Sequence, residues 1–354
     1  MTVSTNANMP ATAMPTTRDR IIAAWLFVVA AMVFAMIVLG GVTRLTQSGL
    51  SITEWWPISG WLPPLDEAAW QEVFGLYRAS PEYLKLNFTM TLAEYKTIFW
   101  LEYAHRLWGR IIGVAFFVPM VVFVARGWVG RALAARLTGL FVLGGAQGAL
   151  GWYMVMSGLV DYPDVSQYRL AAHLALGVAI FAALLWVALD LMRPRVADGA
   201  ATMRGLTRGA LALVGLVFVT QVSGAFVAGL DAGLTYNTFP LMDGQWLPAE
   251  IFAMRPLYVN IFEDIATVQF DHRLLAMTVL AATAWFWWRT RPAPLNREQR
   301  LAINLTAAVA VVQVGLGIAT LLLVVPVPLA ALHQAGAVAL LGAGVWAAHG
   351  LSRD

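Results

Sequence analysis

Four of the five histidines in this 354-residue chain occupy matched positions in two similar halves. His105 and His272 each begin a His-Arg-Leu triplet, and His173 and His333 each lie near the start of a later apolar segment. Two neutral imidazoles that face each other between helices can bind the iron of a b-type haem, one on each face. A lone histidine could equally cap a helix or form a hydrogen bond within the core. Because four are in register, we predict one iron site in each half, and we expect His349, which has no counterpart, to be a surface residue.

Arginines beside these histidines are candidates for binding the carboxylates of a haem. Arg106 and Arg273 directly follow His105 and His272, and Arg110 lies one turn beyond Arg106 with no equivalent in the second half. A guanidinium group can bind a haem propionate through charge-assisted hydrogen bonds. The alternative is that these arginines only extend their side chains to a membrane interface.

An acidic residue distinguishes the first site from the second. Glu102 lies three residues before His105, on the same face of a helix, whereas Gln269 lies three residues before His272. A carboxylate beside one site only suits proton transfer or the orientation of water at a reacting substrate. The alternative is a solvated residue at the mouth of its helix.

The composition predicts that helices in a membrane position these residues. Apolar residues make up 60% of the chain and charged residues 12%, about half the roughly 25% that is usual in soluble domains. The 23 Lys and Arg exceed the 20 Asp and Glu only slightly and form no single patch, so we expect no nucleic-acid partner. Because the chain has no Cys, disulfides, thiolate-bound metals and c-type haem are excluded.

Uncharged stretches long enough to cross a membrane, about 20 residues each, predict the spans. The stretch from Arg300 to Arg353 is too long for one crossing and should break into two helices at Pro326-Val327-Pro328. Two shorter runs can span only if their helices begin earlier and include His105 and His272. With four further stretches, we predict an all-α integral membrane protein of eight transmembrane helices. The four stretches are residues 21–43, 137–160, 170–189 and 209–230.

Charge and internal similarity predict the topology. Arginines gather in alternate short loops, which favours a cytoplasmic location for both termini. Each half contains four predicted helices, an even number, so the halves form a parallel repeat, and the simplest architecture is two four-helix bundles side by side. We divide the chain as follows: residues 1–19, a disordered tail; 20–193, the N-terminal half; 194–208, a cytoplasmic linker; 209–354, the C-terminal half.

Small residues recur on two of the predicted helices. Gly144, Gly148 and Gly151 share one face of a helix, and Gly315 and Gly317 occupy the corresponding helix of the second half. They would allow close approach either of a flat ligand or simply of another helix.

With these residues in place, the chain resembles the haem A synthase family, whose members convert haem O to haem A for cytochrome oxidase. The resemblance extends from about Arg20 to Gly350. It rests on the following segments: Glu102-Tyr103-Ala104-His105-Arg106-Leu107-Trp108-Gly109-Arg110, Ala172-His173-Leu174, Phe270-Asp271-His272-Arg273 and Leu332-His333-Gln334. Because it has no Cys, the chain resembles the Cys-free subgroup of this family, which is found in proteobacteria and mitochondria.

The resemblance implies a division of labour between the two sites. His272 and His333 would bind a resident haem b, with its iron. His105 and His173 would bind the substrate haem O beside Glu102. The reaction would oxidise the C8 methyl group by successive hydroxylation to a hydrated aldehyde, which loses water to give the formyl group.

The resemblance also implies a location and partners. We expect a multi-pass protein of the bacterial inner membrane with its haem sites toward the periplasm. Expected partners are haem O, haem A, membrane lipid, an electron donor, the farnesyltransferase that makes haem O, cytochrome oxidase assembly factors and a second copy of the chain.

The main alternative is a di-haem electron-transfer protein, such as a quinol-linked cytochrome b. It accounts for four histidines equally well, but not for Glu102 on one side only. A transporter would instead be expected to have broken helices and ionisable residues near the midplane, and the predicted helices have neither.

Overall fold

The computed structural model describes residues 14–56, 60–193 and 201–353. Within these ranges the chain is helical, with one isolated β-bridge between Met242 and Gln245. The elements are α1 (Thr17–Leu45), α2 (Glu67–Arg78), α3 (Pro81–Lys85), α4 (Leu92–Ala125), α5 (Arg131–Met156), α6 (Gln167–Met192), α7 (Ala201–Gly229), η1 (Ala232–Leu234), η2 (Leu257–Val259), α8 (Asn260–Glu263), α9 (Ile265–Arg289), α10 (Arg297–Leu322) and α11 (Val327–Leu351).

Among the described helices, seven are long and apolar enough to cross a membrane: α1, α4, α5, α6, α7, α10 and α11. The eighth long helix, α9, has 25 residues and includes Asp271 and Arg273 in its outer turns. The chain is thus an all-α, multi-pass membrane protein. As the short apolar runs required, α4 and α9 begin well before His105 and His272.

Local sequence explains where these helices begin and break. Three of the long helices start with a capping box, in which the cap side chain and the side chain three residues later each accept a hydrogen bond from the other's backbone N–H. The predicted break at Pro326-Val327-Pro328 is confirmed, since α10 ends at Leu322 and Pro326 caps α11. The capping pairs are Thr16–Asp19, Thr91–Glu94 and Asn296–Gln299.

Two of the predicted segments fall partly outside the described residues. Of the tail assigned to residues 1–19, the first 13 lie outside them, and α1 already begins at Thr17. Of the linker assigned to residues 194–208, the first seven lie outside them, and α7 begins at Ala201.

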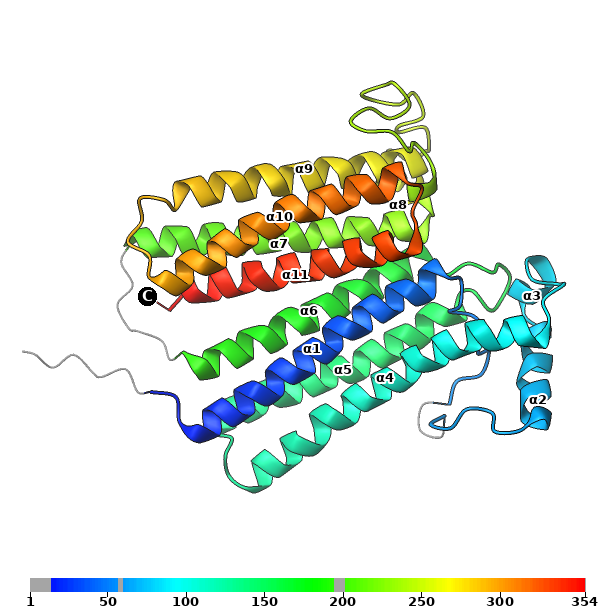
Figure 1. Cartoon of the computed structure of the whole chain (residues 1–354), viewed down its shortest axis with the longest axis horizontal. Helices are drawn as coiled ribbons and strands as arrows, with labels where there is room; N and C mark the ends of the chain where they lie inside the picture. Colours follow the sequence, from blue (N-terminus) through cyan, green and yellow to red (C-terminus); the bar gives the residue numbers. More distant parts are fainter. Residues whose placement is uncertain (1–13, 57–59, 194–200, 354) are drawn as a thin grey trace, which may run out of the picture.

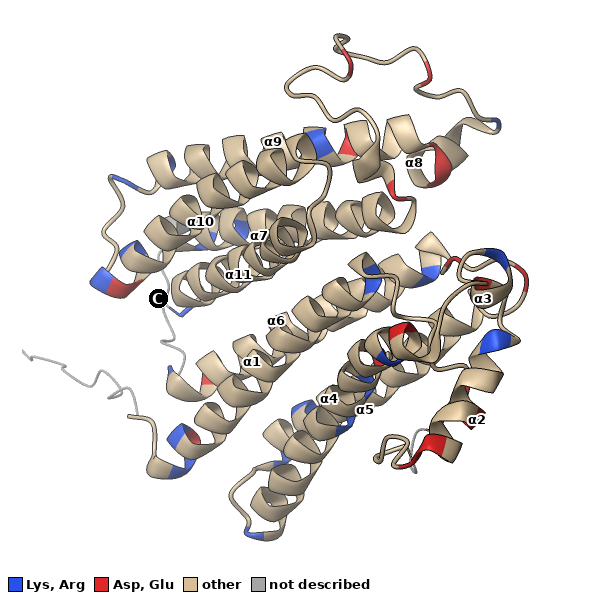
Figure 2. Ribbon diagram, turned by 45° about the vertical axis from the view of Figure 1, so that its right-hand side comes forward, with Lys and Arg blue, Asp and Glu red and all other residues tan. Residues whose placement is uncertain are grey.

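The long helices lie in two groups of four (Figure 1). One group contains α1, α4, α5 and α6, and the other contains α7, α9, α10 and α11. The start of α1 and the end of α11 lie at one end of the molecule, while α2, α3 and the long loop before α9 lie at the other. Lys, Arg, Asp and Glu lie mainly in the loops and toward the helix ends (Figure 2), as expected for helices that pass through lipid.

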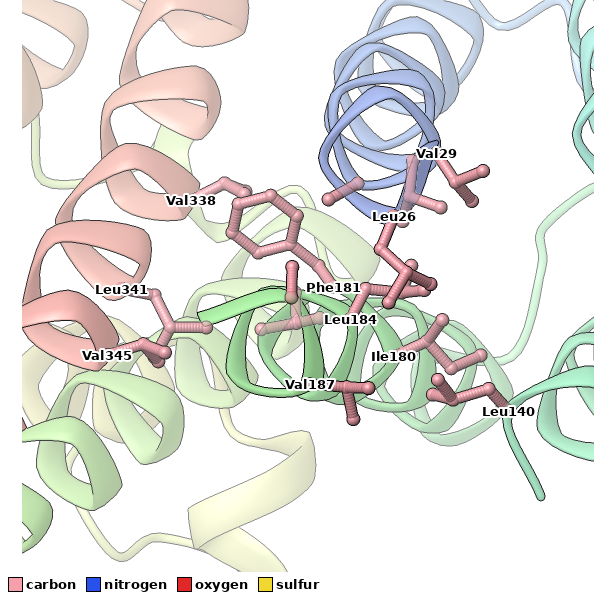
Figure 3. Close-up of a cluster of buried hydrophobic side chains, with 14 of the residues drawn as sticks. Leu26, Val29, Leu140, Ile180, Phe181, Leu184, Val187, Val338, Leu341 and Val345 are labelled. Atoms are coloured by element: carbon pink, nitrogen blue, oxygen red, sulfur yellow. The ribbon is translucent and has the colours of Figure 1, made fainter. Parts of the chain in front are cut away.

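Helix α6 joins the two groups. Its buried side chains contact α1 and α5 on one side and α11 on the other (Figure 3). The interface is therefore a continuous apolar core rather than a loose contact between two domains. Residues of this core are Leu26, Val29, Leu140, Ile180, Phe181, Leu184, Val187, Val338, Leu341 and Val345.

The segment between α1 and α4 has a small aromatic core of its own. Trp70, Phe74 and Tyr77 of α2 pack against Tyr95 and Phe99 at the start of α4. The rings of Tyr77 and Tyr95 are stacked with centroids 4.9 Å apart. This packing fixes α2 and α3 over the end of α4 that leads to His105. We refer to α2 and α3 as the N-terminal cap.

Candidate functional site

The C-terminal pair of histidines lies at a separation suited to one metal ion. His272 on α9 and His333 on α11 have ring centroids 6.4 Å apart, with the ring planes at 88°. Two metal–imidazole bonds of about 2.0–2.1 Å each account for most of this length. The remainder is the distance from each bonding nitrogen to its own ring centre. The residues present therefore fit an iron bound by one imidazole on each side.

Neighbouring side chains fix the orientation of both rings. Ser223 Oγ lies 2.8 Å from His272 Nδ1, and Gln313 Nε2 lies 3.0 Å from His333 Nδ1. Gln313 also donates to the backbone carbonyl of His333, at 2.9 Å. Ser223 Oγ donates to the backbone carbonyl of Thr220 at 2.8 Å and can therefore accept the Nδ1–H of His272, which leaves Nε2 as the ligating atom. The amide N–H of Gln313 can only donate, so Gln313 restrains the position of His333 without selecting which ring nitrogen carries the proton.

The N-terminal pair is arranged differently. His173 on α6 has an equivalent partner, because Gln147 Nε2 lies 3.2 Å from its Nδ1 and donates to its backbone carbonyl at 3.0 Å. His105 on α4 has none, and its Nδ1 is buried without a hydrogen bond. Within the described chain, these two rings also lack the ring contact that joins His272 and His333.

Glu102 lies inside a network that holds the loop after α1 against α4. Its side chain is only 3% exposed, so the alternative of a solvated residue is wrong. One carboxylate oxygen accepts hydrogen bonds from Ser51 Oγ at 2.7 Å and from the backbone N–H of Ile52 at 2.8 Å. The other accepts from Arg106, at 3.0 Å from Nε and 2.6 Å from a terminal nitrogen. Arg106 also donates to the backbone carbonyls of Ile52 and Glu54.

We call Glu102–Arg106 and its contacts with the loop after α1 the N-terminal clamp. The second half contains a corresponding clamp, Gln269–Arg273, in which an amide replaces the acid. Gln269 is 2% exposed and donates to the carbonyls of Ala232 and Thr235, at 2.6 Å each. Its oxygen accepts a 2.8 Å hydrogen bond from Arg273, which also donates to the carbonyls of Tyr236 and Thr238. Glu102–Arg106 and Gln269–Arg273 are therefore equivalent pairs, each fixing an outer loop to the helix that carries a histidine.

The three arginines expected beside haem propionates thus bind backbone carbonyls of the outer loops. Arg110 donates to Trp56 at 2.6 Å, in addition to the contacts of Arg106 and Arg273. Arg273 Nε is buried without a partner and remains available as a donor. Binding of propionates by these residues stays a prediction.

Sequence reasoning missed the partners of the rings. Gln147 and Gln313 occupy matched places in the repeat, and this match was the signal that could have identified them. Ser223 could not have been found in this way, because it has no matching hydroxyl in the first half.

A hydrogen bond joins the two halves next to the sites. Gln334, which follows His333, donates to the backbone carbonyl of Ile37 on α1 at 2.9 Å. Ile37 lies about one turn before the part of α1 that contacts His105. The two sites are thus connected through a short packed segment of α1.

The expectation that His349 is a surface residue is wrong, because its side chain is fully buried. Its ring lies edge-on to Trp186 on α6, and its Nε2 lies 2.9 Å from Asp190 of the same helix. Arg136 and Arg353 also bind Asp190. This cluster joins α6 to α11 at the end of the molecule opposite the four other histidines, so it holds the halves together away from the proposed chemistry.

Fold and site together define a multi-pass helical membrane protein with a pair of histidines in each half. A family model described as a cytochrome oxidase assembly protein matches residues 23–345. Heme A synthase of Nitrosospira multiformis is 54% identical over 334 residues, 94% of each chain, and that of Parvibaculum lavamentivorans is 52% identical over the same shares. Heme A synthase COX15 of Bos taurus is 45% identical over 343 residues, 95% of this chain and 83% of the bovine one. The chain belongs to the haem A synthase family.

Proposed function

We propose that this chain makes haem A from haem O, by oxidising the C8 methyl group to a hydrated aldehyde that loses water to become a formyl group. The observation that carries this proposal, together with family membership, is the difference between the two histidine pairs. One pair is already at bonding separation and held by neighbours, as a permanent cofactor requires. In the other pair, His105 Nδ1 has no hydrogen-bond partner, so that ring is less constrained, which suits a substrate that must enter and leave.

In this proposal His272 and His333 bind a resident haem b, which supplies one-electron redox chemistry when bound. Ser223 and Gln313 hold the two rings in their ligating orientation. His105 and His173 bind haem O in the N-terminal site, and Arg106, Arg110 and Arg273 bind propionates at the outer ends of the helices.

We further propose that Glu102 accepts or returns a proton at the N-terminal site. Its carboxylate is buried three residues from His105, and its partners Ser51 and Arg106 fix its position. The amide of Gln269 occupies the equivalent place in the other half and cannot take part in acid–base chemistry at neutral pH. This is the chemical difference expected between a reacting site and a carrier site.

For the membrane arrangement, we propose that all eight long helices cross a bacterial inner membrane as two parallel four-helix halves. At about 1.5 Å per residue, the 25 residues of α9 exceed the roughly 30 Å of a bilayer core. The positive-inside rule then places both termini in the cytoplasm and the four paired histidines near the periplasmic side. An intramembrane site suits haem O, whose farnesyl chain partitions into lipid.

Haem analysis tests the proposal directly. The protein is expressed in a membrane that supplies haem O and purified, and its non-covalent haems are extracted for chromatography and mass measurement. We expect haem b together with haem O, haem A or a hydroxylated intermediate. Two haem b per chain and nothing else would instead identify a di-haem electron carrier and overturn the proposal. Co-purification from the same membrane tests for the farnesyltransferase, oxidase assembly factors, an electron donor and self-association as partners.

A further inference from the structure

We propose that four glycines act as positioning residues that set the orientation of the four imidazole rings. Each ring packs its Cε1 atom against a glycine on the long helix that precedes its own in the chain. A Cβ atom built on that glycine would lie 2.8 to 3.1 Å from Cε1. The pairs are Gly40 with His105, Gly151 with His173, Gly224 with His272, and Gly317 with His333.

A side chain larger than hydrogen cannot be accommodated without moving the ring. Cβ contacts below 3.0 Å are essentially never observed, and those of Gly40, Gly151 and Gly317 would be 2.8, 2.9 and 2.8 Å. Cε1 lies between the two ring nitrogens, so displacing it displaces both. For His333, Gln313 holds one side of the ring, and the iron would hold the other. The inference therefore rests on the proposed function, which makes these rings ligands.

Other glycines on the same helices show that this contact is specific. A Cβ atom on Gly148, Gly215 or Gly315 would have nothing within 4 Å. Glycines spaced along a membrane helix often serve helix packing, but a Cβ at these three would meet no other part of the described chain. Sequence reasoning left open whether these glycines admit a flat ligand or a neighbouring helix, and in the structure Gly151 and Gly317 each contact a histidine ring of the neighbouring helix.

The expected consequence concerns the electronic properties of the iron. The angle between the two imidazole planes, 88° at the C-terminal site, determines the splitting of the iron d orbitals in a low-spin haem. That splitting is measured as the g values of the electron paramagnetic resonance spectrum. Reduction potential responds to the same change in ligation. The glycines would thus define the plane in which each ring binds, in addition to making room for it.

Gly317→Ala and Gly315→Ala form a matched test, because the two positions are two residues apart on α10 and both changes raise helix propensity. Both variants and the unmodified protein are purified, and bound haem, ferric g values and reduction potential are measured. We expect Gly317→Ala to shift the largest g value and the potential of the C-terminal haem and to lower haem content. Gly315→Ala should match the unmodified protein in all three.

A second pair keeps the test decisive if Gly317→Ala does not accumulate. A Cβ on Gly224 would lie 3.1 Å from His272 Cε1, so Gly224→Ala should give a smaller shift, and Gly215→Ala on the same helix is its control. Spectra of Gly317→Ala or Gly224→Ala that are identical to their controls would overturn the inference. If the unmodified protein binds no bis-histidine haem, the proposed function fails instead, so the two failures are distinguishable.

Discussion

In the C-terminal half the rings of His272 and His333 lie 6.4 Å apart, whereas in the described N-terminal half His105 and His173 make no such ring contact. Equivalent helices, glycines and glutamines surround the two pairs. One difference between them is a single residue. At the position before the packing glycine, α7 has Ser223 and α1 has Leu39. His272 consequently has a partner at Nδ1, and His105 Nδ1 has none.

The loop clamps differ in the same way. Glu102 is a buried carboxylate balanced by Arg106, while Gln269 is a buried neutral amide bound to Arg273. A buried charge is costly to leave unpaired, but it can exchange a proton, which an amide cannot. The buried carboxylate is thus the chemical feature by which the N-terminal site differs from the C-terminal one, and it is the feature that the proposed function uses.

The largest expected effect is the loss of the resident haem. His272→Ala removes one proposed ligand of the C-terminal pair, and we expect the low-spin b-type absorption of the C-terminal haem to disappear from the purified protein. His105→Ala is the matched control, because it changes the corresponding residue of the N-terminal pair and should retain that absorption. A full low-spin spectrum in His272→Ala would show that the two pairs have been assigned to the wrong roles.

Glu102→Gln makes the N-terminal clamp resemble the C-terminal one. Gln269 shows that an amide oxygen can bind the arginine, but its NH2 group donates to carbonyls, whereas Glu102 accepts from the Ile52 N–H. We therefore expect Glu102→Gln to keep its contact with Arg106 and to bind haem, with a weaker hold on the loop after α1. Conversion of haem O should fall about 10²- to 10⁴-fold, the usual contribution of a general acid or base. Equal product yields from Glu102→Gln and unmodified protein would reduce Glu102 to a structural residue.

Breaking the clamps should affect stability unequally. Arg106→Ala leaves the buried carboxylate of Glu102 without its counter-charge, which typically costs about 3–5 kcal/mol. Arg273→Ala leaves a neutral amide oxygen unsatisfied in place of a charge, which costs about 1–3 kcal/mol. Both variants also lose hydrogen bonds to two backbone carbonyls, so that loss does not distinguish them. Thermal unfolding in detergent should therefore show the lower midpoint for Arg106→Ala. If the two midpoints are equal, the buried ion pair contributes no more than the amide pair.

The sequence alone predicts much of this difference between the halves, because the two halves repeat the same spacing of residues. Matched spacing predicted the four histidines as two pairs, and the structure brings the rings of His272 and His333 together. Hydropathy and spacing also predicted the helices in which the four histidines lie. Hydropathy alone could not identify the burial of His349 or Glu102. Both positions are polar residues that become buried only because partners distant in sequence, Asp190 and Ser51, pack against them. Likewise, Gly317 and Gly315 are identical in sequence terms, and only the position of His333 distinguishes them.

A smaller effect is expected from removing the hydrogen bond between Ser223 and His272 Nδ1. Ser223→Ala removes the hydroxyl beside His272 Nδ1, and loss of such a side-chain partner typically weakens metal binding about 10- to 100-fold. We expect faster loss of haem from the C-terminal site to an apo-myoglobin acceptor. Thr220→Ala is the control, because that hydroxyl bonds only within its own helix, to Leu216. Unchanged haem loss in Ser223→Ala would show that His272 needs no partner.

Leu39→Ser introduces a hydroxyl beside His105, at the position that corresponds to Ser223 beside His272. We expect ligand exchange at the N-terminal site to slow and the potential of its haem to fall, because a hydrogen-bonded imidazole is a stronger ligand. The spectrum of the C-terminal haem should not change. Equal shifts at both sites would indicate coupling through α1 rather than a local effect.

The smallest expected effect concerns the N-terminal cap, which contains a buried acid, Glu82. Burial raises the pKa of the Glu82 carboxyl from 4.5 to about 7, even though it accepts a 2.9 Å hydrogen bond from the Tyr77 hydroxyl. The folded cap therefore retains this proton at pH values where the unfolded cap has lost it. The stability contributed by protonated Glu82 is fully present below about pH 4.5 and is lost as the pH rises to about 7.

Hydrogen exchange of the amides in α2 and α3, corrected for the intrinsic effect of pH, should accelerate across this window in the unmodified protein. Glu82→Gln keeps the acceptor for Tyr77 without the charge, so its protection should be independent of pH. The same pH dependence in that variant would assign the effect to another group.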